Sequence, residues 1–230
     1  MKFSKMEILL FVVALFVGIH FYTEYRLEKE IGTPAAAPAE GVAPMGTLLL
    51  DSEKKPVIVA FGDSMTAGVG ANPGEDWPSQ LSTMLGIEII NAGRAGESTA
   101  SGVGRIGRVI DRYKPDIIMI EEGAYDLKNG RRHQTIASNL IKMVKIAMQK
   151  GVKPVLIGFP NVDLLDLMVT SDLDIYEKVA ERTGVYYISD VFGPVLADEE
   201  LKSDDFFHPN AKGYKEIAQR IYRHLMENPL

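Results

Sequence analysis

Short, continuously apolar runs that alternate with longer helix-like stretches limit the fold of this chain more than any other feature. A run of strand length without polar alternation is typical of a parallel strand buried on both faces. The predicted strands lie at 57–61, 87–90, 116–120, 154–159 and 185–188, and the predicted helices at 77–85, 99–113, 134–150, 171–183 and 211–227. This order predicts a three-layer α/β/α sandwich whose functional site lies at the carboxyl ends of the strands.

The composition excludes several classes of function. The chain has 25 Lys and Arg against 31 Asp and Glu, a formal net charge of −6, so we expect no basic surface for nucleic acid. It contains no Cys, which excludes a disulfide framework, a thiolate metal site and a cysteine nucleophile. Any covalent catalysis must therefore use another residue type.

The N-terminus carries the pattern of a membrane-targeting segment. The apolar run ILLFVVALFVGIHFY at 8–22 follows Lys2 and Lys5, which is typical of a signal peptide or of an uncleaved anchor. No A-x-A-like cleavage site follows it, which favours an N-terminal transmembrane helix, although a span usually needs about 20 apolar residues. The preceding lysines predict a cytoplasmic N-terminus and an extracytoplasmic domain, periplasmic or at the cell surface. Cleavage would give a secreted protein instead.

We therefore divide the chain into three regions. Residues 1–24 form the anchor or signal segment, 25–54 an Ala/Pro/Gly-rich tether, and 55–230 the folded domain. The tether includes GTPAAAPAEGVAPMG at 32–46, which has too few large apolar side chains for a core and is expected to be extended.

A serine, a histidine and an aspartate in suitable places predict nucleophilic catalysis. Ser64 follows the first strand in FGDSMTAG, and a hydroxyl there needs a nearby base and a group that orients the base. In DDFFHPN, His208 is the candidate base and Asp205 the orienting acid, while Asn210 can cap the helix that follows. The other histidines fit less well: His20 in the apolar N-terminal run, His133 in a basic loop and His224 deep in the last helix.

Each of these residues also has a simpler interpretation. Ser64 can cap a helix or close a turn, and Asp205 and His208 can be surface turn residues. A metal site built from Asp204, Asp205 and His208 has suitable ligand types but no second histidine nearby. We interpret Asp63 and Asp126 as residues that organise loops.

Two further motifs are interpreted as structural. GESTA at 96–100 approaches the G-x-S-x-G nucleophile elbow but ends in alanine, so Ser98 or Thr99 is predicted to cap a helix. GVGRIG at 102–107 matches the dinucleotide motif G-x-G-x-x-G but lies inside a helix-like stretch instead of directly after a strand. Its glycines are predicted to allow close helix packing or a delayed helix start.

Taken together, the motifs resemble those of the SGNH/GDSL hydrolases, most closely the bacterial thioesterase, arylesterase and lysophospholipase group. The resemblance covers 56–228 and rests on VIVAFGDSMTAGVG, WPSQL, NAGRAGEST, EEGAYD and DDFFHPNAKGYKEIA. It implies a flavodoxin-like sheet of five parallel strands and no cofactor. It also implies that Ser64 is the nucleophile, that His208 and Asp205 complete the triad, and that Gly93 donates to the oxyanion.

One departure from the family pattern affects the expected mechanism. The third motif of the family reads Gly-x-Asn-Asp, with the asparagine donating to the oxyanion, whereas this chain has Tyr125 at that position. Losing one such donor typically costs about 10²- to 10³-fold in rate. Tyr125 either donates through its hydroxyl, leaves the role to the N–H groups of Ser64 and Gly93, or marks a weakened enzyme; Asn129 is a further candidate donor.

These observations predict a serine esterase that cleaves carboxylic esters or thioesters through an acyl-enzyme on Ser64. The segment FPNVDLLDLMV at 159–169 either lines an acyl groove or covers the core. An apolar groove near a membrane would suit lipid, lysophospholipid or aryl-ester substrates. The alternatives are a deacetylase of envelope carbohydrate and a membrane-tethered binding module with weakened catalysis.

Overall fold

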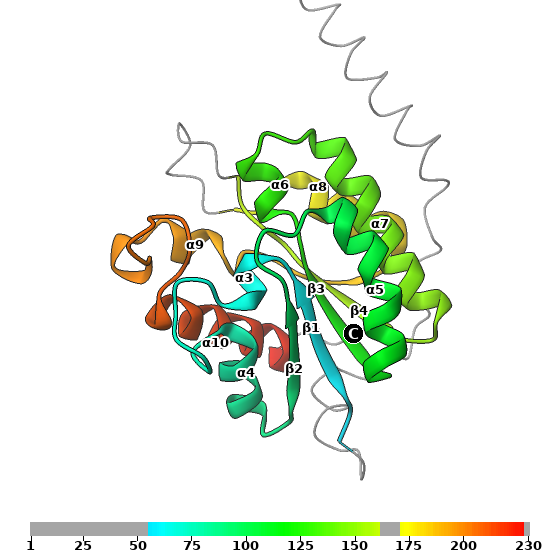
Figure 1. Cartoon of the computed structure of the whole chain (residues 1–230), viewed down its shortest axis with the longest axis horizontal. Helices are drawn as coiled ribbons and strands as arrows, with labels where there is room; N and C mark the ends of the chain where they lie inside the picture. The colour runs from blue at the N-terminus through cyan, green and yellow to red at the C-terminus, as the bar shows by residue number, and fades with distance from the viewer. Residues whose placement is uncertain (1–54, 162–170, 228–230) are drawn as a thin grey trace, which may run out of the picture. The chain divides into compact units, whose positions relative to one another are not determined.

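The computed structural model describes residues 55–161 and 171–227, which form an α/β domain around a five-stranded sheet (Figure 1). The strands are β1 (Ile58–Gly62), β2 (Ile89–Gly93), β3 (Ile117–Glu121), β4 (Lys153–Ile157) and β5 (Tyr186–Ile188). They lie in the order β2-β1-β3-β4-β5, and every neighbouring pair is parallel. The predicted parallel sheet of five strands is confirmed.

The strand order changes direction at β1. Strand β1 pairs with β2 on one side and with β3 on the other, and Gly62 lies opposite both Gly93 and Glu121. The chain leaves β1 toward one edge of the sheet and later returns past it toward the other edge, so β1 and its neighbours form the switch point where ligands bind in such sheets. Ser64 follows directly after β1.

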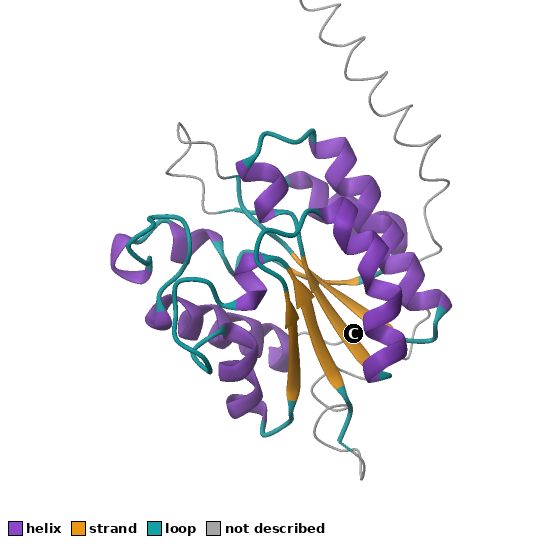
Figure 2. Ribbon diagram, viewed as in Figure 1, coloured by secondary structure: helices purple, strands orange, loops and turns teal. Residues whose placement is uncertain are grey.

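Helices cover both faces of the sheet, as Figure 2 shows. The pair α4 (Trp77–Leu85) and α10 (Ala211–Glu227) packs together on one face, and α5 (Thr99–Tyr113), α7 (His133–Gln149) and α8 (Asp174–Thr183) pack on the other. The shorter helices are α3 (Ser64–Ala67), α6 (Ala124–Lys128), α9 (Gly193–Leu196) and the 3₁₀ helix η1 (Glu199–Leu201). The sequence pattern predicted the long helices and missed the short ones, because three to five residues carry no measurable period.

Side-chain caps explain where several helices begin. The Asp76 carboxylate accepts a hydrogen bond from the Ser79 N–H at 3.0 Å, and Gly86 ends α4 in the left-handed conformation. Ser98 caps α5, which confirms that the serine of GESTA is a cap. Asn210 Oδ1 accepts from the N–H groups of Lys212 and Gly213 at 3.0 Å and so fixes the start of α10.

The strands differ in burial, which explains the largest error in the predicted bounds. All five residues of β1 and of β3 are buried, whereas β2 is an edge strand that is exposed at Asn91 and half-buried at Gly93. We predicted β2 at 87–90 from its apolar residues, but it runs from Ile89 to Gly93. Half-buried edge strands tolerate polar and small residues, so an apolar run underestimates them.

The expected N-terminal helix at 8–22 and the tether lie outside the described residues. Between residues 55 and 161 and between 171 and 227, no helix is both long and apolar enough to cross a membrane. Most of the proposed acyl-groove segment, 162–169, also lies outside the described residues. Its first residue, Phe159, is fully buried against Phe192, with ring centroids 5.2 Å apart. Phe159 therefore belongs to the core.

Candidate active site

The loop after β1 presents Ser64 on a tightly packed turn. Ser64 is the first residue of α3, and this short helix ends at Gly68 with φ +83°. At Gly62, just before the turn, a Cβ atom would lie 2.1 Å from the Glu121 carbonyl oxygen and 2.2 Å from Thr66 Oγ1. Only glycine fits there, because α3 folds back against the end of β3. The sequence FGDSMTAG thus holds the serine at the carboxyl end of the central strand.

The structure brings together the three residues predicted to form the triad. His208 Nε2 lies 2.9 Å from Ser64 Oγ, across 144 residues of sequence. On the other side of the ring, His208 Nδ1 is hydrogen-bonded to Asp205 Oδ2. Ser64 and His208 are buried, and the Asp205 side chain is 45% exposed. A serine, an imidazole and a carboxylate in this order are the parts of a general-base nucleophile.

Asp205 is held as an anion by its own loop. Its Oδ1 accepts hydrogen bonds from the N–H groups of Phe207 (2.9 Å) and His208 (2.8 Å) and from the Ser203 hydroxyl (2.9 Å). Burial raises the pKa of the Asp205 carboxyl, but the hydrogen bonds from His208, Phe207 and Ser203 outweigh burial and hold this pKa well below its usual value. The carboxylate is therefore charged and fixed, as needed to orient the imidazole and to stabilise its protonated form.

Asp63 joins the serine turn to the loop after β3. Its carboxylate accepts from the N–H groups of Met65 (3.0 Å), Gly123 (3.3 Å) and Tyr125 (3.2 Å). Burial raises the pKa of Asp63 to about 6, and these backbone hydrogen bonds oppose that rise. These contacts join two loops through one carboxylate and are those of a residue that organises loops.

Asp126 connects α6 to the first residue of α5. It is buried in α6, and its Oδ2 accepts from the Thr99 N–H at 2.7 Å. Thr99 Oγ1 accepts in turn from the Asn139 amide at 3.0 Å. Asp126 therefore links α6 to the start of α5, and Thr99 links α5 to α7.

The structure places Gly93 close to the serine turn but engages its N–H group elsewhere. The Gly93 N–H donates to Asn91 Oδ1 at 2.9 Å, and a Cβ on Gly93 would lie 2.2 Å from the Ala67 nitrogen. Close packing of α3 against β2 is therefore sufficient to require glycine here. Three residues further on, Gly96 has φ +74° and its N–H forms no hydrogen bond within the described part of the chain. The second glycine of NAGRAG is thus a free donor that the motif analysis did not consider.

The other two candidate oxyanion donors are placed less directly. Tyr125 is 37% exposed, and its backbone N–H is the group that binds Asp63. The Asn129 side-chain amide donates to the Tyr125 carbonyl oxygen at 2.7 Å, so that amide is already engaged. The structure gives Tyr125 a loop-positioning contact through its backbone and leaves its ring partly exposed to solvent.

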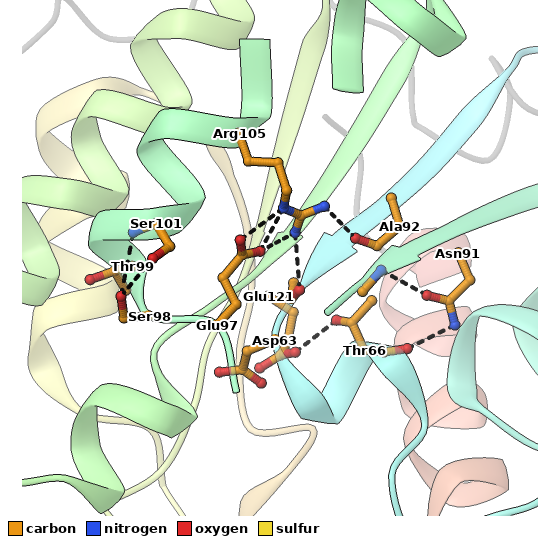
Figure 3. A network of polar contacts seen from close by, with 12 residues as sticks. Asp63, Thr66, Asn91, Ala92, Glu97, Ser98, Thr99, Ser101, Arg105 and Glu121 are labelled. Atoms are coloured by element: carbon orange, nitrogen blue, oxygen red, sulfur yellow. Dashed lines mark hydrogen bonds and ion pairs between the residues drawn. The ribbon is translucent and has the colours of Figure 1, made fainter. Parts of the chain in front are cut away.

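A network of polar contacts connects the serine turn to the ends of the neighbouring strands (Figure 3). The sequence patterns did not predict this network. Thr66 Oγ1 donates to Glu121 Oε2 at 2.7 Å, and the Asn91 amide donates to the Thr66 carbonyl oxygen at 2.8 Å. Arg105 donates to both Glu97 carboxylate oxygens and to the carbonyl oxygens of Ala92 (2.8 Å) and Gly62 (3.3 Å). The network thus links the ends of β1, β2 and β3.

The residues of GVGRIG have packing roles in α5. The Arg105 guanidinium lies 4.0 Å from the centroid of the Phe61 ring. At Gly102 a Cβ would lie 2.9 Å from Glu122 Oε1 and 3.0 Å from Met143 Sδ, whereas the Gly104 position is open. Close packing is therefore confirmed for Gly102 alone. Arg105 lies within the helix predicted at 99–113, but no role was predicted for it.

Glu122 is the least expected residue of this region. Its side chain is fully buried, and neither carboxylate oxygen has a hydrogen-bond partner in the described part of the chain. Burial, together with the charges of Asp63 and Glu97, raises the pKa of Glu122 well above its usual value. Burial and the charge of Asp63 do the same for Glu121. Both carboxyl groups therefore keep their proton to a higher pH than an exposed glutamate does.

The alternative of a metal site at Asp204, Asp205 and His208 finds no support in the geometry. Among residues 55–161 and 171–227, no three His, Asp or Glu side chains converge as metal ligands do. Asp205 is hydrogen-bonded to His208 instead, and the other ring nitrogen of His208 faces Ser64. Asp204 is exposed.

Comparisons with known proteins agree with this geometry. The family model described as GDSL-like lipase/acylhydrolase matches residues 60–216. An arylesterase from Vibrio mimicus is 29% identical over 191 residues, covering 77% of this chain and 92% of the relative. The esterase TesA from Pseudomonas aeruginosa is 25% identical over 180 residues, covering 75% of this chain and 81% of the relative.

Solved structures show the same fold. The esterase EstA from Pseudoalteromonas superposes with a TM-score of 0.67 at 22% identity, covering 75% of this chain and 98% of EstA. AlinE4, an esterase of the SGNH-hydrolase family, is 30% identical with a TM-score of 0.57, covering 76% of this chain and 97% of AlinE4. The resemblance seen in the motifs is confirmed: the chain belongs to the GDSL-like lipase/acylhydrolase family and is a hydrolase of ester bonds.

Proposed function

We propose that the protein is a serine esterase that hydrolyses carboxylic esters through an acyl-enzyme on Ser64. The observation that carries the proposal is the 2.9 Å contact between Ser64 Oγ and His208 Nε2, with Asp205 on the opposite nitrogen of the ring. In this geometry the imidazole is placed to remove the hydroxyl proton as the oxygen attacks a carbonyl carbon.

The reaction then has two halves. Ser64 Oγ attacks the ester carbonyl, His208 takes the proton, and collapse of the tetrahedral intermediate expels the alcohol, which receives that proton from His208. Water then attacks the acyl-enzyme with His208 again as base, and Ser64 leaves with the proton. Asp205 stabilises the imidazolium in both halves, because its carboxylate is charged and held by three further hydrogen bonds.

We assign stabilisation of the oxyanion to backbone donors. The Ser64 N–H belongs to the nucleophile itself, and the loop after β2 supplies the free N–H of Gly96. The Gly93 N–H would first have to leave Asn91 Oδ1. The Tyr125 hydroxyl is a chemically competent donor, and the ring occupies a position where the family pattern has a shorter amide. We propose that this change reshapes the substrate pocket.

Two similar proteins carry names that suggest the substrate class. Because relatives are named an arylesterase and an esterase, we propose small aryl and alkyl esters as substrates, with thioesters and lysophospholipids as related candidates. Hydrolysis of p-nitrophenyl acetate, butyrate and octanoate by the full chain, beside the Ser64→Ala variant, tests this proposal. We expect release of p-nitrophenol that Ser64→Ala abolishes. Equal rates for both proteins would contradict a serine nucleophile, and the chain-length profile separates acetyl from lipid-like substrates.

We also propose that residues 8–22 attach the enzyme to a membrane with the domain on the extracytoplasmic side. The support is the apolar run itself and the lysines that precede it. Alkaline carbonate extraction of membranes from cells that express the full chain tests attachment, and protease accessibility in spheroplasts tests the side. Release of the protein by carbonate would contradict an anchor.

A further inference from the structure

The ring of Phe207 contacts both the Lys128 ammonium and the imidazole of His208, the candidate base. Lys128 is the last residue of α6, and its Nζ is 4.2 Å from the centroid of the Phe207 ring. That ring in turn meets the His208 imidazole edge-on, with centroids 5.0 Å apart and planes at 88°. The cation is therefore part of the rim of the triad, although it contacts neither Ser64 nor His208 directly.

Lys128 is the first residue of a short segment that contains basic residues and no acidic ones. Residues 128–133, KNGRRH, contain three permanent cations and no acid in a chain whose net charge is −6; we call this segment the basic loop. Lys128, Arg131 and Arg132 are exposed, and none forms an ion pair within the described part of the chain. The loop is nevertheless held in place, because the Arg131 N–H donates to the Asp126 carbonyl oxygen at 2.9 Å. These charges are available to a ligand.

Exposed aromatic surface lies beside these charges. Phe206, next to Phe207 in the chain, is 76% exposed and has φ +58°, and Tyr125, on the same short helix as Lys128, is 37% exposed. A non-glycine residue with a left-handed backbone costs about 1 kcal/mol or more, and an exposed ring gains little burial in return. The rim thus combines apolar rings with free cations, which suits a ligand that has an apolar body and an anionic group.

The position of Lys128 relative to the imidazole indicates which part of the substrate it meets. In ester hydrolysis by this arrangement, the imidazole gives its proton to the departing alcohol, so that alcohol lies on the His208 side of the reacting carbonyl. Phe207 contacts the imidazole and Lys128 contacts Phe207, so both are neighbours of the group that gives up the proton. We infer that Lys128 and the basic loop recognise a carboxylate, sulfate or phosphate on the alcohol portion of the ester. This inference rests on the proposed function and narrows its substrate class.

Two esters with the same acyl chain test the inference in the full chain. One is p-nitrophenyl butyrate, whose leaving group is uncharged before cleavage, and the other is 3-carboxy-4-nitrophenyl butyrate, whose leaving group carries a carboxylate. We expect Lys128→Ala to lower the ratio of kcat/KM for the anionic ester to that for the neutral ester about 3- to 5-fold, the effect of one exposed charge. Lys128→Glu should lower the ratio further. Raising the ionic strength to about 0.5 M should reduce the wild-type ratio, because salt screens exposed charges.

The controls separate this inference from general surface charge and from the proposed function. Lys142→Ala removes an exposed lysine from α7 and should leave the ratio unchanged. Mono-p-nitrophenyl glutarate carries its charge on the acyl side and should show no dependence on Lys128. A ratio unaffected by Lys128→Glu, or equally lowered by Lys142→Ala, would overturn the inference while leaving the esterase intact.

A binding measurement decides the inference even if turnover fails. Equilibrium dialysis of 3-carboxy-4-nitrophenol with the Ser64→Ala protein should show weaker binding when Lys128→Glu is added. Absence of turnover of both neutral and anionic esters by the wild type would count against the proposed function alone. Equal binding of the phenol with and without Lys128→Glu would overturn the inference.

Discussion

Asp205 and the pair Glu121 and Glu122 lie in the same domain, but their carboxyl groups have opposite shifts in pKa. On the loop before α10, Asp205 is half-exposed, receives four hydrogen bonds from three residues and is held as an anion. At the end of β3, Glu121 and Glu122 are fully buried, and three of their four oxygens have no partner within the described residues. Burial is the largest cause of the raised pKa values of Glu121 and Glu122, whereas the hydrogen bonds to Asp205 outweigh its partial burial. In the proposed mechanism Asp205 serves the reaction, whereas we expect Glu121 and Glu122 to lower stability at neutral pH.

Removing the charge of Asp205 should have the largest effect. Asp205→Asn keeps the shape of the side chain but cannot stabilise the imidazolium, so we expect kcat to fall about 10⁴-fold, as in other serine triads. Asp204→Asn, one residue earlier on the same exposed turn, is the matched control and should stay within about twofold, since surface substitutions away from a site are usually neutral. Steady-state kinetics on p-nitrophenyl butyrate measure both. Equal losses in the two variants would mean that the loop, and not Asp205, was disturbed.

Removing Glu122 should change stability in the opposite sense. Glu122→Leu replaces an unpartnered buried carboxyl with an apolar side chain of similar size, and we expect the free energy of unfolding to rise by about 1–3 kcal/mol. Glu121→Leu is the matched control: it leaves the Thr66 hydroxyl without its acceptor and should destabilise the protein. Urea denaturation at pH 7 compares them. A destabilised Glu122→Leu variant would show that Glu122 has a partner, such as a buried water.

The two groups also predict the pH dependence of stability. Asp63 has its pKa raised from 3.8 to about 6, and the pKa values of Glu121 and Glu122 are raised well above their usual value, so the folded state holds protons that the unfolded state releases. Their contribution is complete below about pH 4 and is lost as the pH rises through the folded values. Asp205 acts oppositely: its contribution is present above about pH 4 and is lost as the pH falls through its lowered pKa. Stability should therefore fall as the pH rises from about 4.5 to 8.

Denaturation midpoints across that pH range measure the slope, and Glu122→Gln should flatten it because one titrating group is gone. Asp204→Asn, which removes an exposed acid, should leave the slope as it is. A stability that rises between pH 4.5 and 8 would contradict neutral carboxyl groups at the end of β3.

The smallest effect is expected at Phe206, where the active-site loop carries backbone strain. Phe206→Gly should raise the melting temperature by a few degrees, since glycine adopts φ +58° without the steric cost of a Cβ, about 1 kcal/mol. Phe206→Ala keeps the Cβ and should give no such gain, so the pair separates backbone strain from loss of the ring. Differential scanning calorimetry measures both. Equal shifts in the two variants would assign the effect to the exposed ring.

The sequence was informative where the period or spacing of residues is fixed by the fold. The helices at 77–85, 99–113 and 211–227 have the predicted bounds, because their apolar faces and caps are unambiguous. Ser64, Asp205 and His208 came together as expected, since parallel strands bring their carboxyl ends to one edge.

Other features had no signal in the sequence. Glu121, the last residue of β3, and Glu122, directly after it, are of a charged residue type that is usually exposed, yet both are fully buried. Similarly, the hydrogen bond from the Gly93 N–H to the Asn91 side chain lies within β2, and no motif describes it. These features arise from tertiary packing, which the spacing of residue types does not encode.

The separation between Ser64 and His208 has a consequence for the order of folding. The two residues are 144 positions apart, and the helix that Asn210 caps is the last element of the described chain. During synthesis the serine turn leaves the ribosome long before its base exists, and contacts between such distant residues form late in folding. Under the proposed mechanism, a nascent chain cannot cleave esters before His208 reaches Ser64, and the onset of activity would report that the segment leading into the last helix has docked.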